Sequence, residues 1–334
     1  MREAAFAELI GPAGVEIRER PAPIPDSGEA VVDVGACSIN RHDLWILEGD
    51  SAMVDGDDLP FVSGLDLAGT VAEVGDGVTA VAPGDRVVLC PNETCGTCEF
   101  CREAPENLCE NFSLYHGGLA ERALVDADRL VVLPDEVKTT TAAALPTAYM
   151  TAWHMLRRAD VTAGDRALVL GATGGVGVAC VQLLDVLGAA SIGTSTSEAK
   201  LRRLSDLGCD VPVEVDSPDA LRGAVGEVDA VLNHLGGEYT RAALDALRRG
   251  GRMVICGRTA GDRSSFDVAD LFLNHYRVIG STMGTQADLE RLVELVAAGD
   301  LDPVVGEEYD LEDTAAAFAD MRSRDLFGKS IVHP

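Results

Sequence analysis

The chain has 334 residues, a length that predicts two domains, and 47% of them are apolar, which excludes a disordered protein. Asp and Glu number 55 against 27 Lys and Arg, and the resulting net charge of −28 argues against a nucleic-acid partner. No apolar run is long enough to cross a bilayer and the start, MREAAFAELIG, lacks a secretory pattern, so we expect a cytoplasmic protein without membrane association.

Lysine is rare in this acidic chain, and the three that occur are Lys138, Lys200 and Lys329. An acidic, lysine-poor surface is favoured in a salt-rich cytoplasm, because dense salt screens its self-repulsion. We therefore expect a halophilic protein, with an ordinary acidic protein as the alternative.

Residues 1–130 have the pattern of a β-rich domain. Short apolar runs at 29–36, 68–75 and 81–89 are broken by Gly, Pro and Asp at close intervals. This pattern is typical of a small barrel-like domain.

From residue 140 onward the pattern becomes helical and then alternates. The segment 140–159 predicts a helix that is broken at Pro146. The expected strands are 166–172, 190–195, 228–234 and 251–257, and the expected helices are 174–188, 197–208, 239–250 and 287–299. Strand–helix repeats of this kind build a parallel, doubly wound sheet, and a short strand at 327–334 ends the chain. The expected fold class is therefore α/β.

A glycine-rich turn joins the first of these strands to its helix. Backbone N–H groups in such a turn can approach a pyrophosphate at the positive end of a helix, which predicts a dinucleotide site. The expected contacts are Gly171, Thr173, Gly174, Gly175, Val176 and Gly177.

The end of the second strand indicates which dinucleotide binds. NAD sites usually place Asp or Glu there to bind the ribose 2′-hydroxyl, whereas this chain has Ser195. The hydroxyls of Ser195, Thr196 and Ser197 can donate hydrogen bonds to a 2′-phosphate, and Lys200 can add a cation. We therefore expect NADP(H), with a solvated Lys200 as the alternative.

Four of the nine cysteines are clustered, at Cys95, Cys98, Cys101 and Cys109. An odd total and a tight cluster indicate metal binding rather than disulfides. Four thiolates on a short loop suit a tetrahedral structural Zn²⁺, one per chain, with no coordination position left open for catalysis. An iron–sulfur site is the alternative.

With these features the chain resembles, over its whole length, the zinc-type alcohol dehydrogenases and quinone oxidoreductases, the medium-chain dehydrogenases/reductases. The matching features are VAEVGDGV with GDRVV, the four-cysteine lobe, GGLAERALV, GATGGVG and the ending GKSIVHP. The resemblance implies a GroES-like catalytic domain at 1–147 with the zinc lobe at about 90–112, a Rossmann domain at 148–280, and a return to the catalytic domain at 281–334, with the active site in the cleft between the domains.

The resemblance also allows the catalytic position to be read in register. Zinc-dependent members use a second zinc, whose three ligand positions fall here on Asn40, Leu65 and Thr147. None is a good zinc ligand, while Cys37 aligns with a cysteine that is not a ligand. We therefore expect no catalytic zinc, as in the quinone oxidoreductases, although Asp66, His42 and Cys37 could rebuild a site.

Without a catalytic zinc, side chains must polarise the acceptor and supply a proton. His42 falls where zinc-dependent relatives place the Ser or Thr that relays the proton, and an imidazole suits that role. Asn40 could donate a hydrogen bond to a carbonyl oxygen, and Asp66 could tune His42. At the strand ends of the Rossmann sheet, Asn233 and Gly257 are expected near the nicotinamide.

The leading hypothesis is an NADP(H)-dependent oxidoreductase that transfers hydride to a quinone or an α,β-unsaturated carbonyl compound. The alternatives are a zinc-dependent alcohol dehydrogenase acting on small alcohols or aldehydes and a non-catalytic nucleotide-binding sensor. The resemblance further implies a homo-dimer or homo-tetramer, with an edge segment at 270–280.

Overall fold

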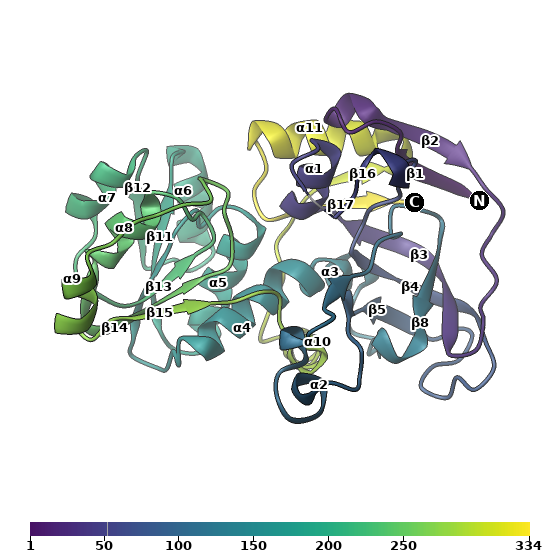
Figure 1. The fold of residues 1–334 in the computed structure, drawn as a ribbon, viewed down its shortest axis with the longest axis horizontal. Helices are drawn as coiled ribbons and strands as arrows, with labels where there is room; N and C mark the ends of the chain where they lie inside the picture. The colour runs from purple at the N-terminus through teal and green to yellow at the C-terminus, as the bar shows by residue number, and fades with distance from the viewer. Residues whose placement is uncertain (52) are drawn as a thin grey trace. The chain divides into compact units, whose positions relative to one another are not determined.

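The computed structural model describes residues 1–51 and 53–334 (Figure 1). The chain divides into two compact units. The first contains Met1–Thr147 and Thr285–Pro334, so that the end of the chain returns to the unit in which it began. The second is the continuous segment Ala148–Gly284.

The first unit is built mainly on antiparallel sheets. Its seven-stranded sheet has the order β16-β17-β3-β4-β5-β9, with β8 also paired to β3, and two small sheets pair β1 with β2 and β6 with β7. The strands are β1 (Arg2–Phe6), β2 (Val15–Glu19), β3 (Glu29–Ser38), β4 (Asp66–Val74), β5 (Arg86–Leu89), β6 (Asn92–Glu93), β7 (Ser113–Leu114), β8 (Arg122–Asp126), β9 (Leu130–Val132), β16 (Val305–Asp310) and β17 (Lys329–His333).

Short helices complete this unit. They are α1 (Arg41–Leu47), α2 (Glu99–Glu103), α3 (Thr139–Ala143), α10 (Gln286–Ala298) and α11 (Thr314–Ser323), with single turns at Pro12–Gly14, Gly56–Asp58, Glu106–Leu108, Ala127–Arg129 and Leu311–Asp313. One apolar core joins the sheet to α1 and α11, in which Phe6 packs edge-on against Phe318 with ring centroids 5.6 Å apart. Leu44, Ile46 and Leu47 of α1 belong to this core, which fixes the helix close to the end of β3, where the predicted catalytic residues lie in the sequence.

The second unit is a six-stranded, all-parallel sheet with the order β12-β11-β10-β13-β14-β15, surrounded by helices (Figure 1). Its strands are β10 (Arg166–Val169), β11 (Ala190–Ser195), β12 (Val211–Glu214), β13 (Val228–Asn233), β14 (Leu247–Ile255) and β15 (Arg277–Gly280). Its helices are α4 (Met150–Arg158), α5 (Gly175–Val186), α6 (Glu198–Asp206), α7 (Pro218–Ala224), α8 (Tyr239–Leu244) and α9 (Val268–Leu273). The predicted α/β class and doubly wound parallel sheet are confirmed.

The expected helix break at Pro146 is also present. α3 ends at Ala143, a π-helical turn covers Leu145–Tyr149, and α4 then begins. Proline lacks the N–H and clashes with the preceding turn, so a regular α-helix cannot continue through it.

One predicted element is too long. The expected helix 239–250 ends at Leu244, and β14 begins at Leu247, which pairs with Val228 of β13. Leu244 and Leu247 have the spacing of a helix face, but hydrogen bonding to the neighbouring strand overrides that local preference. Across residues 1–51 and 53–334, the helices are all too short or too polar to cross a membrane.

Candidate active site and metal centre

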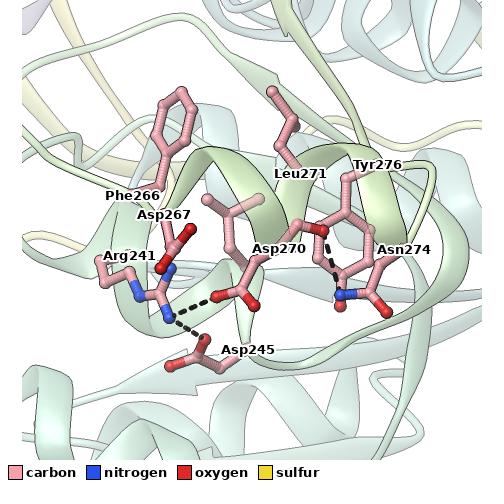
Figure 2. Close-up of a pocket in the computed structure, with 9 residues that line it drawn as sticks. Arg241, Asp245, Phe266, Asp267, Asp270, Leu271, Asn274 and Tyr276 are labelled. Atoms are coloured by element: carbon pink, nitrogen blue, oxygen red, sulfur yellow. Dashed lines mark hydrogen bonds and ion pairs between the residues drawn. The ribbon is translucent and has the colours of Figure 1, made fainter.

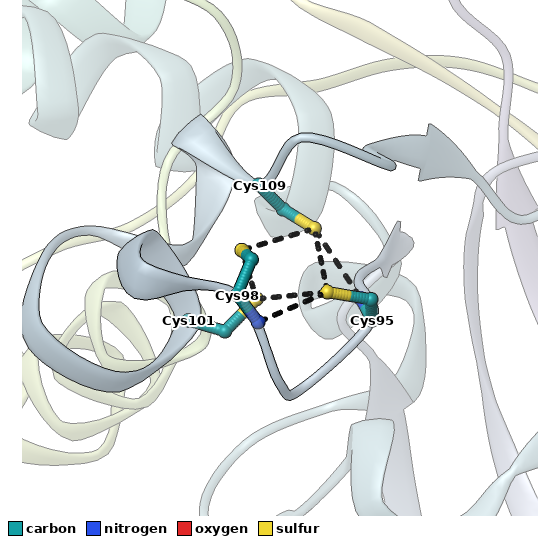
Figure 3. Close-up of side chains that lie close together, drawn as sticks. All are labelled: Cys95, Cys98, Cys101 and Cys109. Carbon is teal, nitrogen blue, oxygen red and sulfur yellow. Dashed lines mark hydrogen bonds between the residues drawn. The ribbon is translucent and has the colours of Figure 1, made fainter.

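The four clustered cysteines converge on one point, with their Sγ atoms within 4.8 Å of one another (Figure 3). The Sγ–Sγ distances are 3.5 Å for Cys95–Cys109 and Cys98–Cys101, 3.9 Å for Cys98–Cys109 and 4.0 Å for Cys95–Cys101. A tetrahedron of thiolates around Zn²⁺, with Zn–S bonds of about 2.3 Å, has edges of about 3.8 Å. These cysteines therefore fit a tetrahedral zinc.

Backbone N–H groups donate hydrogen bonds to the sulfur atoms of Cys95 and Cys109. The N–H of Cys98 donates to Sγ of Cys95, and hydrogen bonds from the backbone and the hydroxyl of Thr97 help to lower the pKa of Cys95 to about 5. The N–H groups of Cys95 and Asn111 donate to Sγ of Cys109. Such bonds favour the deprotonated sulfur that a metal requires.

The glycine-rich turn has the geometry of a dinucleotide site. Gly171 has a φ of +63°, which side chains rarely adopt, and Gly174 is the residue before the first turn of α5. A Cβ on Gly177 would lie 2.4 Å from the carbonyl oxygen of Gly171, so only glycine allows the helix to pack this closely on the turn. The N–H groups of Gly175, Val176 and Gly177 therefore begin a helix of 12 residues immediately after the turn.

The residues predicted to recognise a 2′-phosphate lie at the end of β11 and in the first turn of α6. The hydroxyl of Thr173, in the glycine turn, lies 3.4 Å from that of Ser195. Ser195 also accepts a hydrogen bond from the N–H of Ser197, whose own hydroxyl accepts from the N–H of Lys200 in the first turn of α6. Thr196 lies between these serines in the sequence.

The two residues predicted at neighbouring strand ends differ in their surroundings. Asn233 is fully buried, and its amide binds the N–H groups of Leu235 and Gly236 and the hydroxyl of Thr240. It therefore shapes the loop after β13. Gly257 lies so close to His234 that a Cβ would be 2.4 Å from its carbonyl oxygen.

A closed polar cluster occupies the position read as catalytic. The fully buried carboxylate of Asp66 accepts hydrogen bonds from both the N–H (3.0 Å) and the hydroxyl (2.6 Å) of Thr147. Its other oxygen accepts from the hydroxyl of Ser38 (3.0 Å), the amide of Asn40 (2.9 Å) and the ammonium of Lys329 (3.2 Å).

The ammonium of Lys329 completes this cluster. Only 3% of the Lys329 side chain is exposed, and its Nζ also donates to the carbonyl oxygen of Ile39 and to the amide oxygen of Asn40. All three ammonium hydrogens thus have acceptors, and the negative charge of Asp66 is balanced by a buried positive one.

These contacts show why the three zinc-ligand positions do not fit a metal. Asn40 and Thr147 are committed to Asp66, and Leu65 is a buried aliphatic residue with no donor atom. Cys37 lies in the apolar core, where burial raises the pKa of its thiol well above the usual value. Within residues 1–51 and 53–334, Asp66 makes no hydrogen bond to His42, and the side-chain amide of Asn40 bonds within the cluster, to Ser38, Asp66 and Lys329.

His42 lies in the first turn of α1 and stacks on His116. The two ring centroids are 5.5 Å apart and the rings are inclined by 24°. The sequence provided no reason to single out His116, which follows β7 by two residues and is far from His42 along the chain. Lys329 could have been singled out more easily than His116, because it is one of three lysines in a chain whose other cations are arginines.

A separate pocket of about 230 Å³ lies beside α8 and α9 in the second unit (Figure 2). Its arginine, Arg241, is paired with Asp245 (3.1 Å) and Asp270 (3.0 Å), as Figure 2 shows. The rest of its lining is mixed, with apolar side chains such as Phe266 and Leu271 beside the polar side chains of Asp267 and Asn274. Its lining contains one arginine and three aspartates, so negative charge is in excess, and none of the predicted site residues lines it.

Comparison with known proteins agrees with this architecture. Residues 26–135 match the alcohol dehydrogenase GroES-like domain, and residues 175–298 match the zinc-binding dehydrogenase domain. The chain is 30% identical to an acryloyl-coenzyme A reductase of Metallosphaera sedula, covering 96% of both chains, and 30% identical to a quinone oxidoreductase of Mus musculus, covering 96% of this chain and 94% of that one. The crystal structure of an NAD-dependent alcohol dehydrogenase superposes with a TM-score of 0.92, at 34% identity and full coverage of both chains.

Proposed function

The chain belongs to the family of zinc-type alcohol dehydrogenases and quinone oxidoreductases, the medium-chain dehydrogenases/reductases, and we propose that it is an NADP(H)-dependent reductase of quinones or α,β-unsaturated carbonyl compounds. The observation that carries this proposal is the closed cluster around Asp66. Asn40 and Thr147, at two of the ligand positions, hydrogen-bond to a carboxylate that a lysine ammonium already neutralises.

The chemistry of the acceptor follows from this cluster. An isolated carbonyl or an alcohol gains much from a Lewis acid that stabilises the developing oxyanion. A conjugated acceptor spreads the charge over its own π-system and needs less help. Two relatives are named acryloyl-coenzyme A reductase and quinone oxidoreductase. Both names denote conjugated acceptors, which supports a conjugated substrate for this chain.

Each part of the chain has a definite task in this proposal. The glycine turn and the N-terminus of α5 bind the pyrophosphate, while Ser195 and Lys200 favour the 2′-phosphate of NADP(H). The nicotinamide, when bound, supplies the hydride. His42 supplies the proton that completes the reduction. The four cysteines would hold a zinc that stabilises their loop and takes no part in the reaction.

We also propose that the protein is a homo-dimer or homo-tetramer that pairs through α9 and β15. β15 is an edge strand of the parallel sheet. Large apolar side chains are exposed on α9 beside it: Val268 is 67%, Phe272 62% and Leu273 58% exposed. An exposed apolar patch next to an open sheet edge is typical of a protein–protein interface. The acidic surface supports a salt-rich cytoplasm as the place where this oligomer works.

The decisive experiment is a substrate screen combined with metal analysis. Enones, quinones, an acryloyl thioester, aldehydes and alcohols are offered with NADPH or NADH, as the direction requires, before and after treatment with a chelator. We expect turnover of conjugated acceptors with NADPH, one zinc per chain and activity that resists mild chelation. Two zincs per chain with chelator-sensitive oxidation of alcohols would overturn the proposal in favour of an alcohol dehydrogenase. Cofactor binding without any turnover would instead indicate a nucleotide-binding sensor.

A further inference from the structure

His116 is clamped between two aromatic rings. His42 stacks on it with ring centroids 5.5 Å apart, and Phe61 meets it edge-on with centroids 4.9 Å apart. Phe61 also packs against Phe6 in the core of the first unit, so this clamp is continuous with the rigid part of the domain. Aromatic pairs of this kind contribute about 0.5–1.5 kcal/mol beyond their burial, which is enough to favour one ring orientation.

A hydrogen-bonded chain fixes the tautomer of His116. Asp43 is fully buried and accepts the hydroxyl hydrogen of Ser63 at 2.5 Å, as well as the N–H groups of Asn40 and Gly64. Because the Ser63 hydroxyl hydrogen goes to the carboxylate, its oxygen accepts from Nδ1–H of His116 at 3.3 Å. Neutral His116 therefore carries its proton on Nδ1.

The surroundings keep His116 neutral and, in the part of the chain that the structure describes, leave Nε2 of His42 without a hydrogen-bond partner. Burial and the nearby His42 lower the pKa of His116 to about 4, against a smaller opposing effect of Glu93. Arg41 and Asp43 flank His42 in the sequence, and the carboxylate of Asp43 is committed to Ser63 and to backbone N–H groups. Within residues 1–51 and 53–334, Nε2 of His42 is buried and has no hydrogen-bond partner. Among these residues, no protein group therefore occupies Nε2 of His42, which is left to exchange a proton with substrate.

We propose that His116 is a positioning residue, which acts by stacking its neutral ring on His42 and so holding the proton-donating ring of His42 in one orientation. This inference rests on the proposed function, in which His42 is the proton donor. Ser63 and Asp43 serve the same end, because they lock the ring on which His42 stacks.

The reduction that His116 supports transfers one hydride and then one proton to the acceptor. The hydride forms a C–H bond at the β-carbon of the acceptor, and the π-electron pair of the C=C bond shifts to give an enolate. Protonated His42 then gives its proton to the enolate and becomes neutral, and solvent restores the proton. NADPH is oxidised, the acceptor is reduced, and the net consumption is one hydride and one proton.

The test compares two replacements of His116 that differ only in stacking. His116→Phe keeps a flat ring and is expected to retain kcat within about two-fold at pH 7. His116→Leu keeps the apolar volume without a ring and is expected to lower kcat ~10-fold at unchanged KM, less than the ~10²-fold loss of an acid itself. In a His42→Ala background, His116→Leu should have no further effect, because it acts through His42.

The acid limb of the rate profile supplies a second readout. As the pH falls towards about 4, His116 becomes charged in the wild type; because burial disfavours its charged form, this should disturb its stack on His42 and lower kcat. His116→Phe cannot become charged, so it should keep its rate over this range. Wild-type kcat in His116→Leu, or a loss in His116→Phe as large as in His116→Leu, would overturn the proposal.

A measurement without substrate separates this inference from the proposed function. Nitrogen-15 NMR of the ring nitrogens in the full-length protein should show neutral His116 protonated on Nδ1 at pH 7, and Ser63→Ala should mix its tautomers. His116→Leu should shift the ring protons of His42. If the wild type reduces no acceptor, the proposed function fails while these signals still test the stack. Unshifted His42 protons in His116→Leu would refute the stack, and protonation of His116 on Nε2 would refute the hydrogen-bonded chain through Ser63 that holds its ring.

Discussion

Replacing Lys329 by Met is expected to destabilise the first unit by about 4 kcal/mol. The substitution leaves Asp66 fully buried with no cation and removes the donor from the carbonyl oxygen of Ile39 and the amide oxygen of Asn40. Removing one partner of a buried ion pair costs about 3–5 kcal/mol, because the remaining charge is uncompensated. Met has a similar length, so loss of volume adds little.

The free energy of unfolding of the first unit can be measured selectively. The two tryptophans lie one in each unit, so in a Trp153→Phe background the fluorescence of Trp45 reports the first unit during urea unfolding. Lys138→Met is the matched control, because Lys138 is exposed and its replacement should change stability by less than about 0.5 kcal/mol. Asp66→Asn combined with Lys329→Met leaves no charged side chain in this cluster and should recover at least ~1 kcal/mol. A loss below about 1 kcal/mol in Lys329→Met would refute a cluster held by this cation.

Three further outcomes test other parts of the molecule. Cys95→Ser removes one of four converging sulfurs and should reduce the zinc content well below one per chain by elemental analysis, whereas an unchanged content would contradict a four-thiolate site. Ser195→Asp places a carboxylate at the end of β11, where it would repel a 2′-phosphate. In a fluorescence titration it should weaken NADPH binding ~10-fold or more and leave NADH binding unchanged. An equal effect on both cofactors would show that Ser195 does not recognise the 2′-phosphate. Burial lowers the pKa of His234 to about 4, below the unfolded value of 6.5, so this residue contributes stability that is complete above pH 6.5 and is lost as the pH falls towards 4. His234→Gln should lack that part of the pH slope in urea unfolding, and a slope equal to that of the wild type would contradict it.

The glycine turn and the cysteine loop could be predicted from the sequence because each is local. Gly171 to Gly177 lie within one strand–turn–helix unit, and the four cysteines lie within one loop of the first unit. Their residue types carry the chemistry directly: glycine permits close backbone approach, and thiolates bind zinc. The alternation of strands and helices likewise indicated the parallel sheet, although the end of α8 depended on hydrogen bonding to β13.

The state of the catalytic position was only partly visible in the sequence. The sequence showed that Asn40, Leu65 and Thr147 are poor zinc ligands, since that conclusion needs residue types alone. It did not show that Asn40 is committed to Asp66, nor that His42 has a stacking partner. Hydrogen bonds and ring contacts depend on which side chains face one another, and no local pattern encodes that.

The sequence by itself therefore determined the α/β architecture, the glycine-rich turn before α5, the cluster of four cysteines, and the poor metal-binding chemistry of Asn40, Leu65 and Thr147. Only the tertiary structure decided which groups surround Asn40 and Thr147. Two strand pairings, Ser38 with Asp66 and Ser38 with Ile331, bring β3, β4 and the C-terminal strand β17 side by side. Sheet register thus places the ammonium of Lys329 against Asp66, 263 residues away in the chain, because hydrogen bonding between strands is indifferent to their separation in sequence.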